Sequence, residues 1–208
     1  MKIAVVGAGN VGSAVGRAGV NTGHDVVMAS RTPEKAQTVA GSIGAKAASS
    51  PAEAARDADL VVLAVPFGAV TDVAEEIADA VAGKVVVDVI NPLKADFSGL
   101  ATDRSAAEEV QERLPNARVV KAFNTVFASN QANPTVDGTP LDGFYAGDDA
   151  DAKQVVADLL SAIGYRPIDV GGIQLARALE HMAFLNILLN ATKGWSWQSG
   201  WKLVGPTG

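Results

Sequence analysis

The stretch KIAVVGAGNVGSAVG (residues 2–16) decides the fold of this chain. A short apolar run leads into Gly7, Gly9 and Gly12, which have the spacing G-x-G-x-x-G. Glycine makes up 21 of the 208 residues, so the spacing alone is a weak signal. Because the glycines follow a predicted strand and open a predicted helix, they indicate a dinucleotide-binding turn much more strongly.

Each glycine has a separate role in such a turn. Gly7 permits the tight bend, Gly9 lets a pyrophosphate approach the backbone, and Gly12 lets the helix lie close to the strand. The backbone amides of Asn10, Val11 and Gly12 would then point at the phosphates, supported by the positive end of the helix. The alternative is a glycine turn that serves helix packing only.

Apolar runs rich in β-branched residues alternate with helical stretches along the chain. This alternation predicts an α/β fold of the Rossmann type, a doubly wound parallel sheet with a small, mostly helical C-terminal part. We expect strands at 2–7, 25–30, 60–66, 84–90, 118–124, 143–147 and 166–171. We expect helices at 11–22, 33–43, 51–57, 69–81, 106–114 and 151–163.

The predicted elements divide the chain near residue 147. Residues 1–147 would form the nucleotide-binding domain, and residues 148–208 a small C-terminal subdomain that covers the pocket. The segments 91–104 and 128–142 lack periodicity and are predicted to be loops, which often carry function.

Two features stand out in the C-terminal part. Residues 173–194 are apolar on nearly every side, which predicts a helix buried all round, packed on the sheet and contributing to a homodimer interface. The segment WSWQSGW (195–201) then holds all three tryptophans. They would form either an aromatic seal on the core or dimer interface, or a wall of the substrate pocket.

Composition excludes several classes of function. The net charge of −6 argues against binding to nucleic acid or an anionic membrane. The absence of cysteine excludes disulfides, thiolate metal sites and thiol nucleophiles, and two histidines are too few for a histidine-rich metal cage. Apolar runs fall well short of the about 20 residues of a membrane span. A strand begins at once with no signal peptide, so we expect a cytoplasmic protein.

The end of the second strand, MASRTPEK (28–35), indicates which dinucleotide binds. An NAD enzyme needs a carboxylate there for the adenosine ribose hydroxyls. This chain has Ser30 and Arg31 instead, with Lys35 four residues further on. A hydroxyl, a guanidinium and an ammonium suit a 2′-phosphate, which predicts NADP(H). Alternatively, Arg31 and Lys35 are ordinary solvated charges.

The nicotinamide is expected at the carboxyl ends of later strands, across the switch point of the sheet. Three segments reach this edge: Val65, Pro66 and Phe67; Asn91 and Pro92; and Ala122, Phe123 and Asn124. Apolar side chains of the first segment offer a wall for the ring, and Pro66 turns the chain away from the sheet. Asn91 and Asn124 would hydrogen-bond a carboxamide or a substrate ring, or serve as turn and cap residues.

General acids and bases are scarce. His24 lies in a TGHD turn at the far end of the sheet, and His181 on the C-terminal helix is more readily a core residue than a catalyst. Arg177 and Glu180 are spaced to pair with each other, and nothing further marks Lys121. This scarcity suits direct hydride exchange between two ring cofactors, which needs stacking and exclusion of water more than proton transfer. We therefore predict no catalytic side chain and no metal.

Five segments together resemble one known family, the NADPH-dependent coenzyme F420 reductases (F420H2:NADP oxidoreductases). They are VVGAGNVGSAVG (5–16), ASRTPEKA (29–36), RSAAEEVQERLP (104–115), VVKAFNTV (119–126) and ARALEHMAFLNI (176–187). The resemblance covers essentially the whole chain. It implies a Rossmann domain, a small C-terminal part, a homodimer and reversible hydride transfer between NADP(H) and the deazaflavin F420.

The resemblance also implies site residues. The NADP-binding positions are Ala8 to Val11 (Ala8, Gly9, Asn10 and Val11), Ser30, Arg31 and Lys35, and the residues lining the nicotinamide are Val65, Val70 and Ala122. The phosphate and acidic tail of F420 would need positive groups, for which Lys94, Arg104, Lys193 and Lys202 are available.

One position departs from the family pattern. Asn124 stands where typical archaeal members carry a histidine, and the form KAFNT (121–125) is also similar to the oxidoreductase domain of the STEAP metalloreductases. Two alternatives therefore stay open: an NADPH-dependent flavin or ferric reductase that uses FMN or FAD, and a non-enzymatic NADPH-binding regulator. Small imine or 2-hydroxy-acid dehydrogenases are a fourth reading, although they usually carry a larger helical domain.

Overall fold

Three parallel strands, β1 (Lys2–Val6), β4 (Leu60–Leu63) and β5 (Val85–Asp88), form the centre of the sheet in the computed structural model, which describes residues 1–205. Every residue of these strands except Lys2 is buried. Continuous apolar runs are typical of strands covered on both faces, as the sequence predicts.

The sheet has eight strands in the order β10-β9-β6-β5-β4-β1-β2-β3. Neighbours are parallel except β6 and β9, which pair antiparallel. The strand order reverses between β1 and β4, the switch point at which such sheets bind ligands. The outer strands are β2 (Asp25–Ala29), β3 (Lys46–Ala47), β6 (Arg118–Lys121), β9 (Asp142–Gly147) and β10 (Arg166–Asp169).

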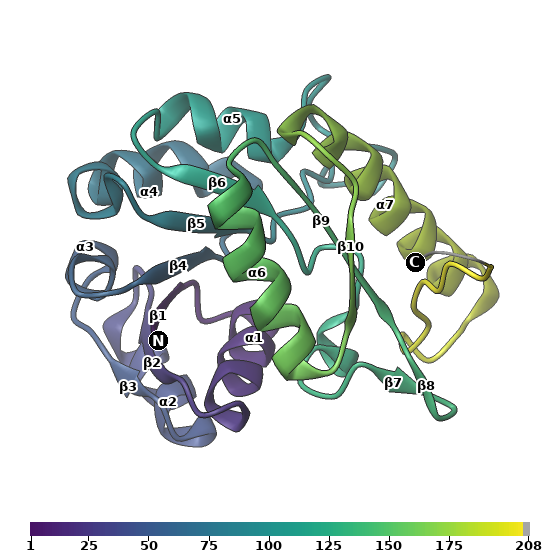
Figure 1. Ribbon diagram of the computed structural model, residues 1–208, viewed down its shortest axis with the longest axis horizontal. Coiled ribbons are helices and arrows are strands. Elements are labelled where there is room, and N and C mark those ends of the chain that lie inside the picture. Colours follow the sequence, from purple (N-terminus) through teal and green to yellow (C-terminus); the bar gives the residue numbers. More distant parts are fainter. Residues whose placement is uncertain (206–208) are drawn as a thin grey trace.

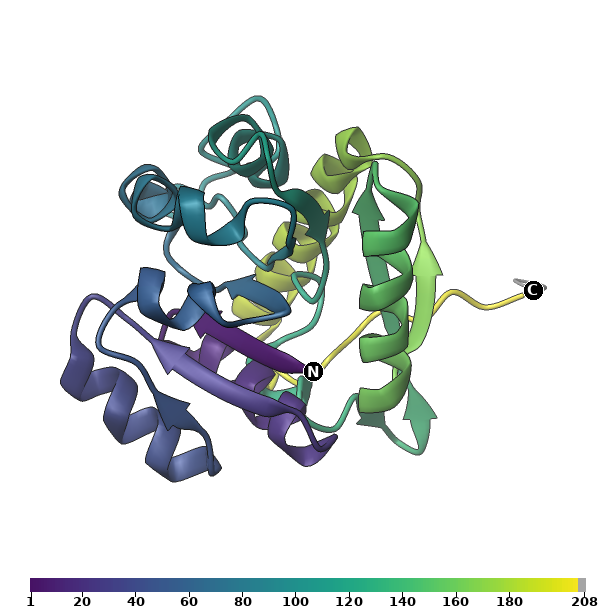
Figure 2. The same ribbon diagram turned by 60° about the vertical axis from the view of Figure 1, so that its left-hand side comes forward.

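Helices cover both faces of the sheet (Figure 1). One apolar cluster joins a face of the sheet to α1 (Asn10–Asn21), α2 (Pro33–Ile43) and α6 (Ala150–Ile163). A second cluster joins the opposite face to α3 (Pro51–Arg56), α4 (Val70–Ile77), α5 (Ala106–Arg113) and α7 (Ala176–Lys193). The two layers confirm the predicted doubly wound fold, and Figure 2 shows them from the side.

Short elements complete the chain. Four 3₁₀ turns are η1 (Phe67–Ala69), η2 (Ala78–Val81), η3 (Ala128–Asn130) and η4 (Ile173–Leu175). A small hairpin consists of β7 (Thr135–Val136) and β8 (Thr139–Pro140). The prediction of an unstructured loop at 128–142 was therefore wrong in part, because two-residue strands and a single turn carry no periodic signal.

Within one chain, the C-terminal helix α7, which was predicted to be buried all round in the domain or against a partner, is buried on one face. Its buried face consists largely of small and amide residues: Ala176, Leu179, Glu180, Ala183, Asn186 and Asn190. Small side chains bring this face close to the rest of the fold. Leu185 is 48% exposed. His181 is also exposed, so the expectation of a core histidine was wrong.

A buried charge cluster ties α7 to the sheet. The Lys121 ammonium on β6 lies 2.8 Å from Asp88 Oδ2 and 2.6 Å from Glu180 Oε1, and all three side chains are fully buried. Glu180 Oε1 also accepts a hydrogen bond from the amide of Ala106, at the start of α5. The predicted pairing of Arg177 with Glu180 was therefore wrong, and Arg177 instead donates to the carbonyl of Asp103.

Replacing Lys121 with methionine should lower the free energy of unfolding by about 3–5 kcal/mol, because two buried carboxylates lose their cation. Urea denaturation at neutral pH measures the change. The matched control is Lys46→Met, which breaks an exposed ion pair with Asp25 and should cost about 0–1 kcal/mol. A loss of less than 1 kcal/mol for Lys121→Met would show that the cluster does not hold the fold together.

Stability should also depend on the protonation of Glu180. Burial raises the pKa of Glu180 above its ordinary value of 4.5, against the opposing effect of Lys121. The native state therefore holds this proton more tightly than the unfolded state does, and the stabilisation is lost as the pH rises from about 4.5 through the raised pKa. Over that range the unfolding free energy of the wild type should fall relative to that of Glu180→Gln. Urea denaturation of both proteins at a series of pH values tests this, and a constant difference would contradict it.

Candidate functional site

The glycine turn between β1 and α1 is fixed by backbone contacts. Gly7 has a φ of +127°, and a Cβ there would lie 2.1 Å from the carbonyl oxygen of Ala64. A Cβ at Gly12 would lie 1.9 Å from the Gly7 carbonyl oxygen. Both positions thus exclude any side chain, since α1 lies directly against the ends of β1 and β4.

Gly9 is glycine for a different reason. A Cβ at this position would meet no atom within 4 Å, so the backbone faces open space. Gly9 is the N-cap of α1, and the helix start has neither a side-chain cap nor an acidic residue in its first turn. The first helical hydrogen bond runs from Ser13 N to Gly9 O. The preceding amides therefore remain available to an anion.

A cavity of about 230 Å³ lies in front of this turn. It gathers residues from the ends of β1, β2 and β4: Val6, Gly7, Ala8, Gly9, Ser30, Arg31, Thr32, Lys35, Pro51, Ala64, Val65, Pro66, Ala69 and Val73. Eight of the predicted binding residues lie here together, namely Gly7, Ala8, Gly9, Ser30, Arg31, Lys35, Val65 and Pro66. We call this the small cavity.

Among the described residues that line the small cavity, Arg31 and Lys35 are the only charged ones. Both are exposed, and within residues 1–205 neither forms an ion pair. The Ser30 hydroxyl donates to the Thr32 carbonyl at 2.6 Å and so shapes the turn that carries Arg31. The arrangement leaves two positive charges uncompensated beside the cavity, which fits a phosphate dianion.

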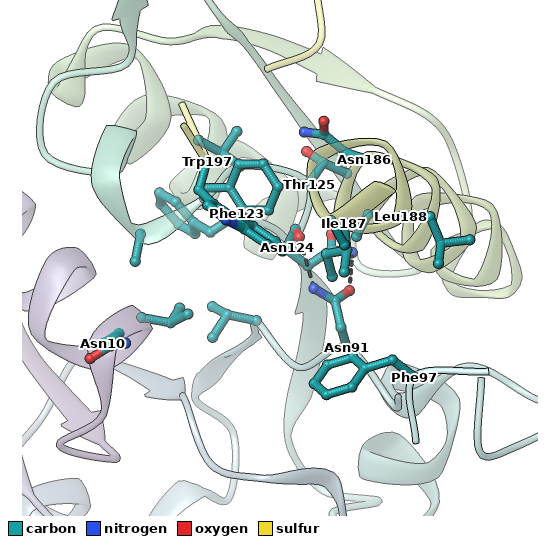
Figure 3. A pocket seen from close by; sticks show the side chains of 17 residues that line it. Asn10, Asn91, Phe97, Phe123, Asn124, Thr125, Asn186, Ile187, Leu188 and Trp197 are labelled. Atoms are coloured by element: carbon teal, nitrogen blue, oxygen red, sulfur yellow. Dashed lines mark hydrogen bonds between the residues drawn. The ribbon is translucent and has the colours of Figure 1, made fainter. Parts of the chain in front are cut away.

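A second, larger cavity of about 750 Å³ begins where the first ends, and we call it the large cavity. Gly9 lines the small cavity, and the next two residues, Asn10 and Val11, line the large one. The other lining residues are Val89, Asn91, Phe97, Phe123, Asn124, Thr125, Val126, Phe127, Ala128, Ala183, Asn186, Ile187, Leu188, Ala191 and Trp197. None of these described residues is acidic, basic or a histidine, and Figure 3 shows the largely apolar walls.

Two asparagines that line the large cavity are hydrogen-bonded to each other (Figure 3). Asn91 Nδ2 donates to the carbonyl of Asn124 at 2.9 Å, and Asn124 Nδ2 donates to Asn91 Oδ1 at 2.9 Å. The side-chain oxygen of Asn124 is buried and has no partner within the described chain, and the same holds for the hydroxyl of Thr125. Unpartnered buried polar atoms are rare, and both of these belong to the loop that forms one wall of the large cavity.

Residues that the sequence did not single out hold this loop in place. Gln131 Nε2 donates to the carbonyls of Phe123 and Val126, at 2.7 and 2.9 Å. The Tyr165 hydroxyl donates to Gln131 Oε1 at 2.7 Å. Burial raises the pKa of Tyr165, so this hydroxyl remains a donor. Neither residue belongs to a motif, and a buried glutamine has no signature in one sequence.

Five predicted residues line neither cavity. Gly12 is buried inside α1, Val70 in the layer of α3 and α4, Pro92 after β5, and Ala122 after β6. Phe67 packs half-buried against the same layer as Val70.

The four candidate cations also lie outside the lining of the large cavity. Arg104 pairs with Glu112 at 2.6 Å, and Lys202 lies 3.1 Å from Asp142. Lys94 and Lys193 are exposed, and neither is ion-paired within residues 1–205. They belong to the loop of Phe97 and the last turn of α7, which both border the cavity.

The three tryptophans separate. Trp197 lines the large cavity, Trp195 is 48% exposed, and Trp201 packs partly buried against the core.

No helix of the described chain is both long and apolar enough to cross a bilayer. Residues 1–205 also contain no group of three or more His, Cys, Asp or Glu side chains placed to hold a metal ion.

Comparison with known proteins places the chain in a family. Residues 2–92 match the family model described as NADP oxidoreductase, coenzyme F420-dependent. The F420-dependent NADP reductase of Methanothermobacter thermautotrophicus is 35% identical, and the alignment covers 91% of this chain and 89% of the relative. Metalloreductase STEAP3 of Rattus norvegicus is 32% identical over 86% of this chain but only 36% of its own length.

Solved structures agree with the fold. A candidate F420-dependent NADP reductase from Arthrobacter sp. FB24 has a TM-score of 0.89 and 30% identity, covering 98% of this chain and all of that one. The imine reductase of Streptomyces aurantiacus, at 23% identity and a TM-score of 0.68, shares the fold. The 35% identity to the Methanothermobacter thermautotrophicus reductase, over 91% of this chain and 89% of that protein, shows that the chain belongs to the F420-dependent NADP reductase family.

Proposed function

We propose that the protein catalyses reversible hydride transfer between NADP(H) and the deazaflavin coenzyme F420. The observation that carries this proposal is the adjacency of two cavities at one glycine turn. The small cavity has a phosphate-binding helix end and two free cations. The large cavity has no ionisable side chain among its lining residues. Family membership supports the same reaction.

NADP(H) would lie along the small cavity with its 2′-phosphate between Arg31 and Lys35. The open space in front of Gly9 accommodates the pyrophosphate, and the first amides of α1 donate to it. Val65 and Pro66 flank this path, while Val70 and Ala122 are buried in the core clusters on opposite faces of the sheet.

The nicotinamide would then enter the large cavity past Asn10 and Val11. The free side-chain oxygen of Asn124 can accept a hydrogen bond from the carboxamide, with Asn91 holding Asn124 in position. Bound together, the two cofactors supply the hydride donor and the hydride acceptor. The chain orients their rings between largely apolar walls. The acceptor ring takes up one proton together with the hydride, and this proton would come from solvent, because none of the described lining residues is ionisable.

The flavin or ferric reductase remains the second candidate. It is favoured by Asn124 in KAFNT and by the similarity to STEAP3, a relative of which this chain spans about a third. The regulator hypothesis needs only the small cavity. It leaves the free polar atoms of the large cavity without a role, which favours an enzyme.

We also propose the setting in which the protein acts. A homodimer would cover the outward face of α7, where Leu185 is half exposed. We place the protein in the cytoplasm, in agreement with its charge and lack of cysteine. Residues 148–208 would serve as the C-terminal subdomain over the pocket. Among them, α7 and Trp197 line the large cavity, while β10 extends the sheet.

Replacing Arg31 with alanine should raise the Kd for NADPH by about tenfold or more and leave the Kd for NADH nearly unchanged, because a charged hydrogen bond to the 2′-phosphate is lost. Fluorescence titration of both nucleotides measures this. Arg17→Ala is the matched control, since Arg17 is an exposed arginine of α1 outside both cavities. An equal rise in the Kd for NADPH and for NADH would show that Arg31 does not bind the 2′-phosphate.

Mixing the protein with NADPH and oxidised F420 should bleach the deazaflavin absorbance band. Parallel mixtures with FMN and FAD are expected to react much more slowly. Turnover with a flavin alone would favour the flavin reductase. Binding of NADPH without reduction of any acceptor would favour the regulator.

A further inference from the structure

Backbone strain in this protein concentrates at the large cavity. Among residues 1–205, four residues other than glycine have a positive φ: Phe97, Phe123, Asp137 and Trp197. Three of them, all aromatic, line the large cavity. Such conformations persist only where surrounding contacts hold them, and they cluster at functional sites.

Trp197 is held in its strained conformation from both sides. Its amide donates to Asn190 Oδ1 on α7 at 3.1 Å, and its carbonyl accepts from the Ser129 hydroxyl at 2.6 Å. Asn130 Nδ2 donates to the next carbonyl, that of Gln198, at 2.7 Å. The indole ring meets the ring of Phe127 edge to face, with centroids 5.4 Å apart. The side chain is thus fixed while 44% of the residue stays exposed.

Phe97 borders the same cavity from the loop after β5. Its amide donates to the Lys94 carbonyl, and Lys94 N donates to Gly99 O, both at 2.9 Å. A β-bridge between Leu93 and Leu100 closes the base of this loop. Phe97 is 56% exposed, although a phenyl ring gains by burial. In Figure 3, Trp197 and Phe97 lie on either side of the Asn91–Asn124 pair.

We propose that Trp197 and Phe97 are aromatic walls of the acceptor site: one of them stacks on the face of the hydride acceptor that the nicotinamide leaves free, and the other contacts the edge of the same ring system. This inference rests on the proposed function. A rigid, exposed aromatic side chain beside an uncharged cavity suits a planar heteroaromatic ligand, because stacking covers both surfaces at once. A deazaflavin and a flavin share this chemistry, so the stacking residues set affinity for the ring, and other groups distinguish F420 from FMN.

The test replaces each ring by asparagine, which tolerates a positive φ and therefore lets the loops fold. Trp197→Asn and Phe97→Asn should each raise the Kd for oxidised F420 by about tenfold, measured by calorimetry, with the Kd for NADPH changed by less than about twofold. The fluorescence of bound F420, quenched by contact with the indole, should recover in Trp197→Asn. Trp197→Phe should retain most of the affinity.

Trp195→Asn is the matched control. Trp195 lies two residues away in the same segment and is 48% exposed, but it does not line the cavity. It should alter neither Kd. Thermal unfolding of every variant checks the fold, and if Trp197→Asn is destabilised, Phe97→Asn decides the test.

The outcomes separate the two claims. If the wild type binds F420 and both asparagine variants bind it equally well, the stacking proposal is wrong and the proposed function stands. If FMN binds in place of F420 and depends on Trp197 in the same way, the stacking proposal stands and the F420 assignment fails. If NADPH binds but neither F420 nor FMN does, both proposals are overturned.

Discussion

The close approach of α1 to the ends of β1 and β4 is the constraint on which the rest of the site depends. A Cβ at Gly12 would lie 1.9 Å from the Gly7 carbonyl oxygen, and a Cβ at Gly7 would lie 2.1 Å from the Ala64 carbonyl oxygen, so both would clash. This contact directs the free amides of α1 into the crevice at the point where the strand order reverses. It also makes the turn the shared border of the two cavities, so a long cofactor bound along the small cavity delivers its far end into the large one.

A second constraint positions the side of the large cavity that is formed by α7 and by the loops after β5 and β6. The buried cluster of Lys121, Asp88 and Glu180 links β5, β6 and α7 directly beneath the loops that carry Asn91 and Asn124. Buried ionic groups are costly and often specify geometry more than stability. Here they fix where α7 crosses the sheet, and α7 in turn holds Trp197 through Asn190. The large cavity therefore depends on a charge cluster that does not touch it.

Much of the fold follows from local sequence signals. The glycine spacing, the continuous apolar runs and the alternation of elements predicted the doubly wound sheet, and the end of β2 brought Ser30, Arg31 and Lys35 to one cavity. The predicted strands run too far, however. The predicted runs continue two or three residues beyond β4, β5 and β6. The residues that follow β5 and β6 are buried as well, whereas those that follow β4 are half-buried or exposed. Periodicity cannot distinguish a buried strand from a buried loop.

What the sequence could not predict depends on pairing between distant segments. Lys121 and Glu180 are 59 positions apart, and nothing local indicates that they meet. Gln131 holds the Asn124 loop, and its own partner Tyr165 is 34 positions away. The positive φ of Trp197 is likewise held by contacts with Ser129 and Asn190. These long-range contacts turn a nucleotide-binding fold into one with a second site.

The central claim is that the chain brings two rings into contact and transfers a hydride directly, without an acid or base. The most direct measurement uses NADPH deuterated at the nicotinamide C4 carbon, on each face in turn, with oxidised F420 in ordinary water. We predict that one of the two labelled forms transfers its deuterium completely to the reduced deazaflavin. If the ring carbon that receives the hydride carries no deuterium with either labelled form, the account is contradicted.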